Sequence, residues 1–139
     1  MAPATRHQTV GVPQPPRPRL APIFDLVCIT TFVLLGGERH QEISQGVSWF
    51  LGVMWPLCVG WFGVALATRL YTRTESLWPA LTITWVGCIV ITQVLRGAVT
   101  NDAWIGIFTV VATTYLFLTA FGWRLIGGLV ARRRAPSAM

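Results

Sequence analysis

Four long apolar runs, separated by short polar segments, fill most of this 139-residue chain. They cover residues 20–37, 49–68, 78–95 and 104–126. A helix needs about 20 apolar residues to cross the hydrocarbon core of a bilayer, with a range of about 17–25. All four runs have this length, the first because the Gly36-Gly37 pair extends it. The pattern predicts an all-α membrane protein, a bundle of four antiparallel transmembrane helices.

The composition supports one membrane domain and little else. Hydrophobic residues make up 53% of the chain and charged residues 12%, about half of the share that is usual in soluble domains. The short connections leave no room for a separate soluble domain, so we predict one transmembrane domain over residues 20–130. Residues 1–19 are rich in proline and arginine without an apolar period and are predicted to be disordered. Residues 131–139 are predicted to form a basic cytoplasmic tail.

The arginines predict the orientation. With the N-terminus in the cytoplasm, only Arg39 and Arg96 fall outside, and the other nine arginines fall inside. This positive-inside bias predicts that both termini are cytoplasmic. Arginine without lysine, in a chain rich in alanine, glycine and valine, is typical of a high-GC bacterial genome, which places the protein in a bacterial cytoplasmic membrane. The basic residues are not gathered with aromatics on one exposed face, so no nucleic-acid partner is expected.

Asp25 is the most informative single residue, because a carboxylate within a membrane span is costly and marks a candidate functional site. It lies about 7–8 Å inside the cytoplasmic end of the first run at 1.5 Å per residue. Arg69 and Arg124 end up at a compatible depth, so a structural ion pair with one of them is the favoured interpretation. A role in proton or ligand handling and simple snorkelling toward water are the alternatives.

The third run carries a polar stripe at a spacing of four residues, formed by Thr84, Cys88, Thr92 and Arg96. Residues four apart lie on one helix face. Hydroxyl and thiol groups on such a face commonly bond to a neighbouring helix, and Thr109, Thr113 and Thr114 of the fourth run are the expected partners. Packing between helices is the favoured interpretation, and a polar permeation path is the alternative.

A mixed-charge cluster follows the first run and consists of Glu38, Arg39, His40 and Glu42. We expect a solvated loop with one or two ion pairs. The alternative is a small extracytoplasmic site with His40 as proton carrier. The cluster lacks the ligand spacing of a metal site.

No metal or cofactor is expected elsewhere. Cys28, Cys58 and Cys88 all fall within the runs, where buried thiols behave as small apolar side chains. The sequence contains no phosphate-binding loop, dinucleotide fingerprint, nucleophile elbow or zinc-protease motif. An enzyme is therefore the less favoured class.

Tryptophans and small residues give two further expectations about packing. Trp49, Trp78, Trp104 and Trp123 lie near run ends, as in an interfacial aromatic belt, and Trp55, Trp61 and Trp85 lie deeper and are expected to pack between helices. Gly63 and Ala67 are four residues apart and form a small-residue face that permits close helix approach. That face packs either within the bundle or against a second protomer.

Short motifs, taken in order, resemble one known family. They are Asp25, the Gly37/Arg39/His40 turn, Trp55-Pro56, Gly60-Trp61, Leu77-Trp78-Pro79, Leu95-Arg96-Gly97 and Gly122-Trp123-Arg124. Over about residues 22–130 the chain resembles the bacterial membrane family called domain of unknown function 3054, known mostly from high-GC Gram-positive bacteria. One departure is that Glu38 separates Gly37 from Arg39, whereas in the family arginine directly follows the glycine. The resemblance implies a four-helix inner-membrane protein and no established activity.

These observations favour a non-enzymatic membrane component that lies in the lipid bilayer. We expect it to assemble as a homodimer or within a larger complex. The alternative is a small transporter or channel that uses Asp25 and the polar stripe. A weaker alternative is an enzyme that acts on lipid-linked substrates through Glu38 and His40.

Overall fold

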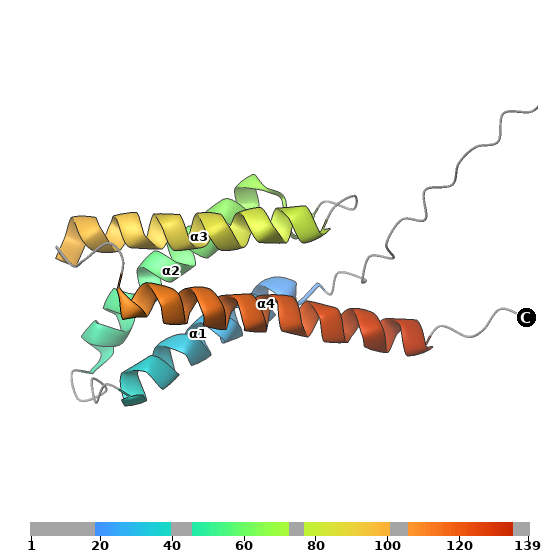
Figure 1. Cartoon of the computed structure of the whole chain (residues 1–139), viewed down its shortest axis with the longest axis horizontal. Helices are drawn as coiled ribbons and strands as arrows, with labels where there is room; N and C mark the ends of the chain where they lie inside the picture. The colour runs from blue at the N-terminus through green and yellow to red at the C-terminus, as the bar shows by residue number, and fades with distance from the viewer. Residues whose placement is uncertain (1–18, 40–45, 73–76, 101–105, 135–139) are drawn as a thin grey trace, which may run out of the picture.

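The computed structural model of the chain describes residues 19–39, 46–72, 77–100 and 106–134 (Figure 1). The described residues form four α-helices: α1 (Ala21–Arg39), α2 (Val47–Ala67), α3 (Leu77–Thr100) and α4 (Ile107–Arg134). Each is long and apolar enough to cross a membrane. The predicted all-helical class with four membrane-length helices is therefore confirmed.

The helices extend beyond the predicted apolar runs. α1 continues past Gly37 to Arg39, α3 continues past Arg96, and α4 continues into the segment predicted as a basic tail. Helical hydrogen bonding does not stop where the side chains become polar, and cations near a helix C-terminus are favourable because of the helix dipole. The predicted start of the fourth run at Trp104, and the terminal segments 1–18 and 135–139, lie outside the described residues.

Each helix packs against two neighbours: α1 contacts α2 and α4, and α3 contacts the same two helices. In Figure 1, α3 and α4 lie along each other and the other two helices cross behind them. The pair with the most extensive contact is α2 and α3, because each helix places a glycine against the other at their interface. A Cβ atom added at Gly60 would lie 2.9 Å from the backbone oxygen of Cys88, and one at Gly87 would lie 3.0 Å from both γ-carbons of Val64.

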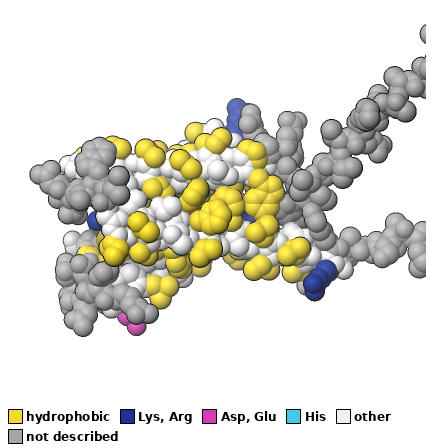
Figure 2. All heavy atoms as spheres, in the orientation of Figure 1, with side chains coloured by type: hydrophobic (Ala, Val, Ile, Leu, Met, Phe, Trp, Pro, Cys, Tyr) yellow, Lys and Arg dark blue, Asp and Glu magenta, His cyan; other side chains and the backbone are white. Residues whose placement is uncertain are grey.

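The interior and the exterior of the bundle are both apolar. Val33, Leu57 and Leu81 are fully buried between the helices. On the outside, Leu66 and Ile107 are more than 70% exposed, at 72% and 80%. Figure 2 shows hydrophobic side chains across the middle of the visible face. An apolar exterior of this extent needs a lipid environment, which supports a multi-pass membrane protein.

The large aromatic residues divide between the core and the exterior. Trp61 is fully buried, and Trp85 is half-buried and donates a hydrogen bond to the backbone oxygen of Thr113 at 3.0 Å. The expectation that Trp55 packs between helices is wrong, because its side chain is 41% exposed. Hydropathy gives the depth of a residue along a span but not the face on which it lies, since lipid and core are equally apolar.

Candidate functional site

Asp25 lies in the second turn of α1, and its side chain is buried where α1, α2 and α4 meet. Its carboxylate accepts five hydrogen bonds, from side chains of α2, the turn after α2, and α4. A buried charge is tolerated only when it is paired and its remaining lone pairs are satisfied. Both conditions are met here.

Arg124 of α4 is the charge partner. Its Nη1 donates to Oδ1 of Asp25 at 2.8 Å and its Nη2 donates to Oδ2 at 2.7 Å. Nη1 also donates to the backbone oxygen of Ala120 at 3.0 Å. Both charged side chains are almost fully removed from solvent, with 1% of Asp25 and 4% of Arg124 exposed. This two-bond geometry is the strongest arrangement of a carboxylate with arginine, and it fixes the relative position of α1 and α4.

Three aromatic donors complete the shell around the carboxylate. The Tyr71 hydroxyl donates to Oδ2 at 2.8 Å, the Trp61 indole donates to Oδ2 at 3.2 Å, and the Trp123 indole donates to Oδ1 at 3.1 Å. The Trp61 indole is also 3.1 Å from the Tyr71 hydroxyl oxygen, so it is shared between the two acceptors. We call Asp25, Trp61, Tyr71, Trp123 and Arg124 the carboxylate network.

Tyr71 reaches the network because α2 ends in a tight turn. The backbone N–H of Leu70 bonds to the oxygen of Ala65 at 2.9 Å, and that of Arg69 bonds to the oxygen of Leu66 at 3.1 Å. Arg69 has a φ of 53°, the left-handed conformation that reverses the chain in this helix-ending motif. Leu70 is buried beneath the turn. The turn therefore directs Tyr71 back toward α1.

The environment keeps the Tyr71 hydroxyl protonated. Burial raises its pKa, and the negative charge of Asp25 raises the pKa further. The phenol therefore remains a neutral donor at physiological pH. A donor that does not ionise holds the carboxylate in one fixed arrangement.

The sequence model of the protein family of unknown function DUF3054 matches residues 23–127. The chain belongs to this family. The predicted resemblance is confirmed, and the match includes the whole carboxylate network. Three of the motifs that carry the resemblance, Asp25, Gly60-Trp61 and Gly122-Trp123-Arg124, meet in this network. No curated protein and no solved structure matches the chain.

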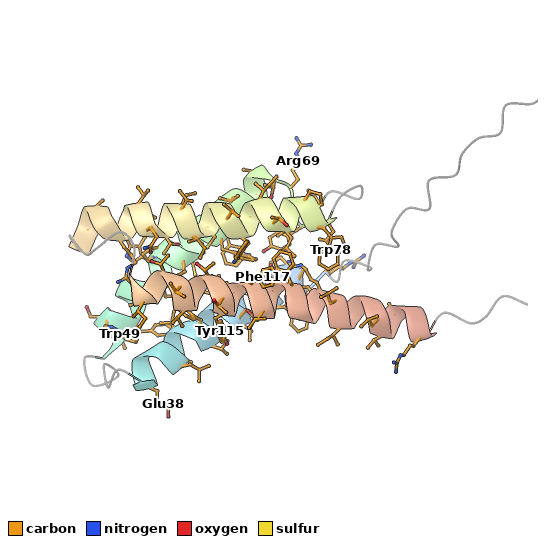
Figure 3. The ribbon with its side chains drawn as sticks, in the orientation of Figure 1. Glu38, Trp49, Arg69, Trp78, Tyr115 and Phe117 are labelled. Carbon is orange, nitrogen blue, oxygen red and sulfur yellow. The ribbon has the colours of Figure 1, made fainter. Side chains whose placement is uncertain are left out.

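Of the two arginines considered for Asp25, the structure brings Arg124 to the carboxylate and leaves Arg69 outside the bundle. Figure 3 shows Arg69 projecting away from the helices. Sequence reasoning missed Trp61, Tyr71 and Trp123 as donors. Trp123 was expected to lie in the interfacial aromatic belt. Its position next to Arg124 was the sequence feature that could have indicated a role beside Asp25. Tyr71 lies in the irregular turn after α2, for which no periodic sequence pattern exists.

The first three residues of the stripe on α3 face α2. Thr84, Cys88 and Thr92 are all buried. The Thr84 hydroxyl lies 3.0 Å from that of Thr68, the Cys88 thiol lies 3.7 Å from the Leu57 oxygen, and the Thr92 hydroxyl donates to the Pro56 oxygen at 3.3 Å. These contacts join two helices. These three residues therefore belong to the α2–α3 interface.

The prediction that the stripe bonds to threonines of the fourth helix is wrong. The Thr109 hydroxyl instead accepts a hydrogen bond from Gln93, and the backbone oxygen of Thr113 accepts one from Trp85. Thr114 is exposed. The fourth residue of the stripe, Arg96, lies with its guanidinium carbon 4.0 Å from the ring centre of Phe108 on α4. A spacing of four residues drifts about 40° per step, so a stripe of four members turns onto a second neighbour.

Most of the outer cluster lies outside the described residues. Glu38 is exposed at the end of α1, on the opposite end from Arg69 (Figure 3). The side chain of Arg39, and His40 and Glu42 entirely, are among the residues that the structure does not describe. Within the described segments, no group of His, Cys, Asp and Glu side chains could hold a metal ion.

Proposed function

We propose that this DUF3054 protein is a non-enzymatic component of a bacterial cytoplasmic membrane, with a bundle held together by the carboxylate network. The observation that carries the proposal is that the carboxylate of Asp25 is fully hydrogen-bonded. Asp25 is 1% exposed and accepts five hydrogen bonds. A carboxylate that carries protons or ligands must exchange its partners. Asp25 instead joins α1 to α2 and α4, as a structural clamp does.

The contacts between α1 and α4 support an antiparallel arrangement. Asp25 meets Arg124, Thr31 lies 2.9 Å from the Tyr115 hydroxyl, and the Phe32 ring lies 5.7 Å from that of Phe108. In these contacts, later residues of α1 pair with earlier residues of α4. With the excess of arginines at the ends that hold both termini, this arrangement favours cytoplasmic termini. The carboxylate network then lies toward the cytoplasm, and Arg96 lies toward the outside.

The topology predicts a labelling pattern in intact cells. In a chain whose three native cysteines are replaced by alanine, a cysteine at position 41 or 100 should react with a membrane-impermeant maleimide from outside. A cysteine at position 74 should react only after lysis. The arginine distribution is the physical reason, because cytoplasmic loops retain positive charge. Labelling of position 74 from outside would refute the orientation.

The α2–α3 interface argues against the transporter alternative. The hydroxyl and thiol groups of Thr84, Cys88 and Thr92 are engaged with α2, as described above. Hydrogen bonds of this kind hold helices together, so these three side chains act in helix packing and do not line a path for a cargo.

The assembly that we propose is a homodimer formed through the outer face of α2. Gly63 and Ala67 are both exposed, and a Cβ atom added at Gly63 would meet nothing within 4 Å. Small residues that face lipid permit the close backbone approach on which helix association in membranes depends. Gly60, by contrast, packs within the bundle. The small-residue face therefore supports contact with a second copy.

Gly63→Leu should convert a detergent-solubilised dimer into a monomer and leave the helical content unchanged, because the leucine blocks approach of the second helix without touching the bundle. Light scattering and circular dichroism measure the two properties. Gly127→Leu is the matched control, since Gly127 also has open space around its Cβ position. A monomeric wild type would refute self-association. Recovery of a differently tagged second copy from native membranes would support it, and recovery of other proteins alone would favour a complex subunit.

A further inference from the structure

The end of the bundle at which α1 begins and α4 ends carries a large excess of positive charge, and we call it the basic end. Nine of the eleven arginines precede α1, follow α2 or belong to the last three turns of α4. The acidic side chains of the same segments are Asp25 and Glu75. Asp25 already pairs with Arg124. Even if Glu75 pairs with another arginine, most of the arginines remain without a counter-charge, so the sign of this end follows from the sequence alone.

Three arginines of the basic end are exposed in the described part of the chain: Arg19, Arg69 and Arg133. They come from three different places, before α1, after α2 and near the end of α4. Among the described residues, the acidic side chains are Asp25, which is buried, and Glu38, which lies at the opposite end (Figure 3). Figure 2 shows Lys and Arg side chains projecting from the outer edge of the basic end. These guanidinium groups are therefore accessible to an anion.

An exposed leucine adjoins each of the three arginines. Leu20 follows the first and is 55% exposed, Leu66 lies three residues before the second and is 72% exposed, and Leu129 lies four residues before the third and is 58% exposed. Large apolar side chains with this exposure face lipid in a membrane-spanning bundle. The arginines therefore lie on the perimeter of the bundle, at the level where hydrocarbon chains give way to headgroup phosphates.

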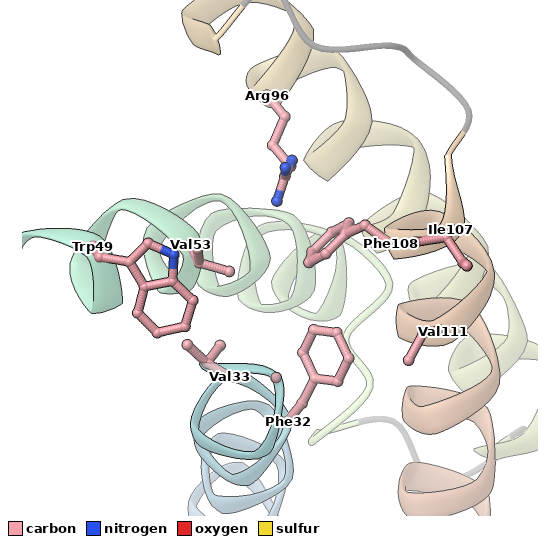
Figure 4. Close-up of a pocket in the computed structure, with 9 residues that line it drawn as sticks. Phe32, Val33, Trp49, Val53, Arg96, Ile107, Phe108 and Val111 are labelled. Carbon is pink, nitrogen blue, oxygen red and sulfur yellow. The ribbon is translucent and has the colours of Figure 1, made fainter. Parts of the chain in front are cut away.

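The opposite end of the bundle treats its arginine differently. Figure 4 shows Arg96 extending from α3 into a cavity lined by Phe32, Trp49 and Phe108. Arg96 is half-buried, and its guanidinium carbon lies 4.0 Å from the centre of the Phe108 ring. This arginine is engaged within the protein. Among the arginines whose side chains the structure describes, the exposed ones are all at the basic end.

We propose that the basic end binds anionic phospholipids of its own bilayer, with headgroup phosphates on Arg19, Arg69 and Arg133 and acyl chains along the leucines beside them. A guanidinium donates paired hydrogen bonds that match a phosphate, and anionic lipids attract arginines placed next to the membrane. A lipid phosphate is the occupant because each cation adjoins a lipid-facing side chain. The proposal goes beyond the structural role of the carboxylate network. It does not depend on the orientation, because these arginines share one end whichever leaflet that end faces.

Quenching of tryptophan fluorescence by lipids with brominated chains tests the proposal on the full chain in phosphatidylcholine vesicles. Brominated phosphatidylglycerol should associate with the protein about fivefold more strongly than brominated phosphatidylcholine, since an arginine near an anionic surface contributes about 1 kcal/mol, a factor of about five. The triple variant Arg19→Gln/Arg69→Gln/Arg133→Gln should bring this ratio toward one. A wild-type ratio of one, or an unchanged ratio in the triple variant, would overturn the proposal.

Two control variants and two additions of salt complete the test. Replacing the same three arginines by lysine should keep the preference, because the charge remains, and Arg96→Gln should leave it unchanged, because Arg96 lies at the other end. An equal fall of the ratio in Arg96→Gln would contradict the location. Without any substitution, raising sodium chloride to about 0.5 M should lower the wild-type ratio, because salt screens exposed charges. An unchanged ratio would contradict exposed arginines, and a larger fall with inorganic phosphate at equal ionic strength would identify a soluble anion and overturn the lipid proposal.

Discussion

Asp25→Asn is expected to lower the free energy of unfolding by about 3–5 kcal/mol, because it leaves the guanidinium of Arg124 buried without its counter-charge. Asparagine also places an N–H₂ group where the carboxylate accepts hydrogen bonds from Trp61, Tyr71 and Trp123. At least one of these donors would then face another donor. Unfolding in mixed micelles, followed by circular dichroism during a titration with dodecyl sulfate, measures the loss.

A double-mutant cycle identifies the partner. Arg124→Gln should destabilise the protein by a similar amount, and the double variant Asp25→Asn/Arg124→Gln should lose less than the sum of the two. Residues in one ion-pair network typically couple by about 0.5–3 kcal/mol. Arg69→Gln is the matched control, because Arg69 is exposed and its substitution should stay within about 0.5 kcal/mol of the wild type. Additive losses for Asp25 and Arg124 would contradict the clamp.

The sequence allowed the prediction that Asp25 forms an ion pair, but it did not identify the partner. A carboxylate inside a span requires a cation at its own depth, and both Arg69 and Arg124 satisfied that requirement. The choice depends on the turn after α2, where Arg69 adopts a φ of 53° and its side chain leaves the bundle. A left-handed arginine at a position that glycine usually occupies has no signature in a single sequence.

The faces of the helices were the least predictable feature. In a soluble protein the apolar side of a helix marks the core, but here lipid and core are equally apolar and the pattern does not distinguish them. Gly63 and Ala67 showed the spacing of a packing face, and yet they lie outside the bundle. Gly60 makes the close approach to α3. Trp55 and Trp61 were assigned alike for the same reason, although only Trp61 is buried.

For the same reason, only part of the carboxylate network could be predicted from the sequence. Asp25 and Arg124 stood out because charge within a span is rare. Trp61 and Trp123 did not, because tryptophan is common in membrane proteins both in the core and at the interface. Their indole N–H groups matter only once the helices bring them to the same carboxylate, which is a property of the packing and not of the local pattern.

Gly60→Ala should destabilise the bundle by about 1–3 kcal/mol, which is the usual cost of inserting one methyl group into a packed core. The added Cβ would lie 2.9 Å from the backbone oxygen of Cys88 and 3.0 Å from the hydroxyl of Thr92. The hydroxyl can rotate away, but the Cys88 oxygen belongs to α3, so the two helices must separate. Separation would also lengthen the hydrogen bonds that join α2 to α3 at Leu57 and Pro56.

Gly63→Ala is the matched control for this variant, since it makes the same chemical change three residues away on the same helix. Its Cβ would meet nothing within 4 Å, so the stability of the isolated bundle should remain within about 0.5 kcal/mol of the wild type. Gly60→Leu should prevent folding altogether, whereas Gly63→Leu should still give a folded chain. The measurement is dodecyl sulfate unfolding at a detergent excess that keeps the wild type monomeric, so that dimer contacts do not contribute. Equal losses at the two glycines would mean that α2 does not present Gly60 to α3, because only that contact distinguishes the two positions.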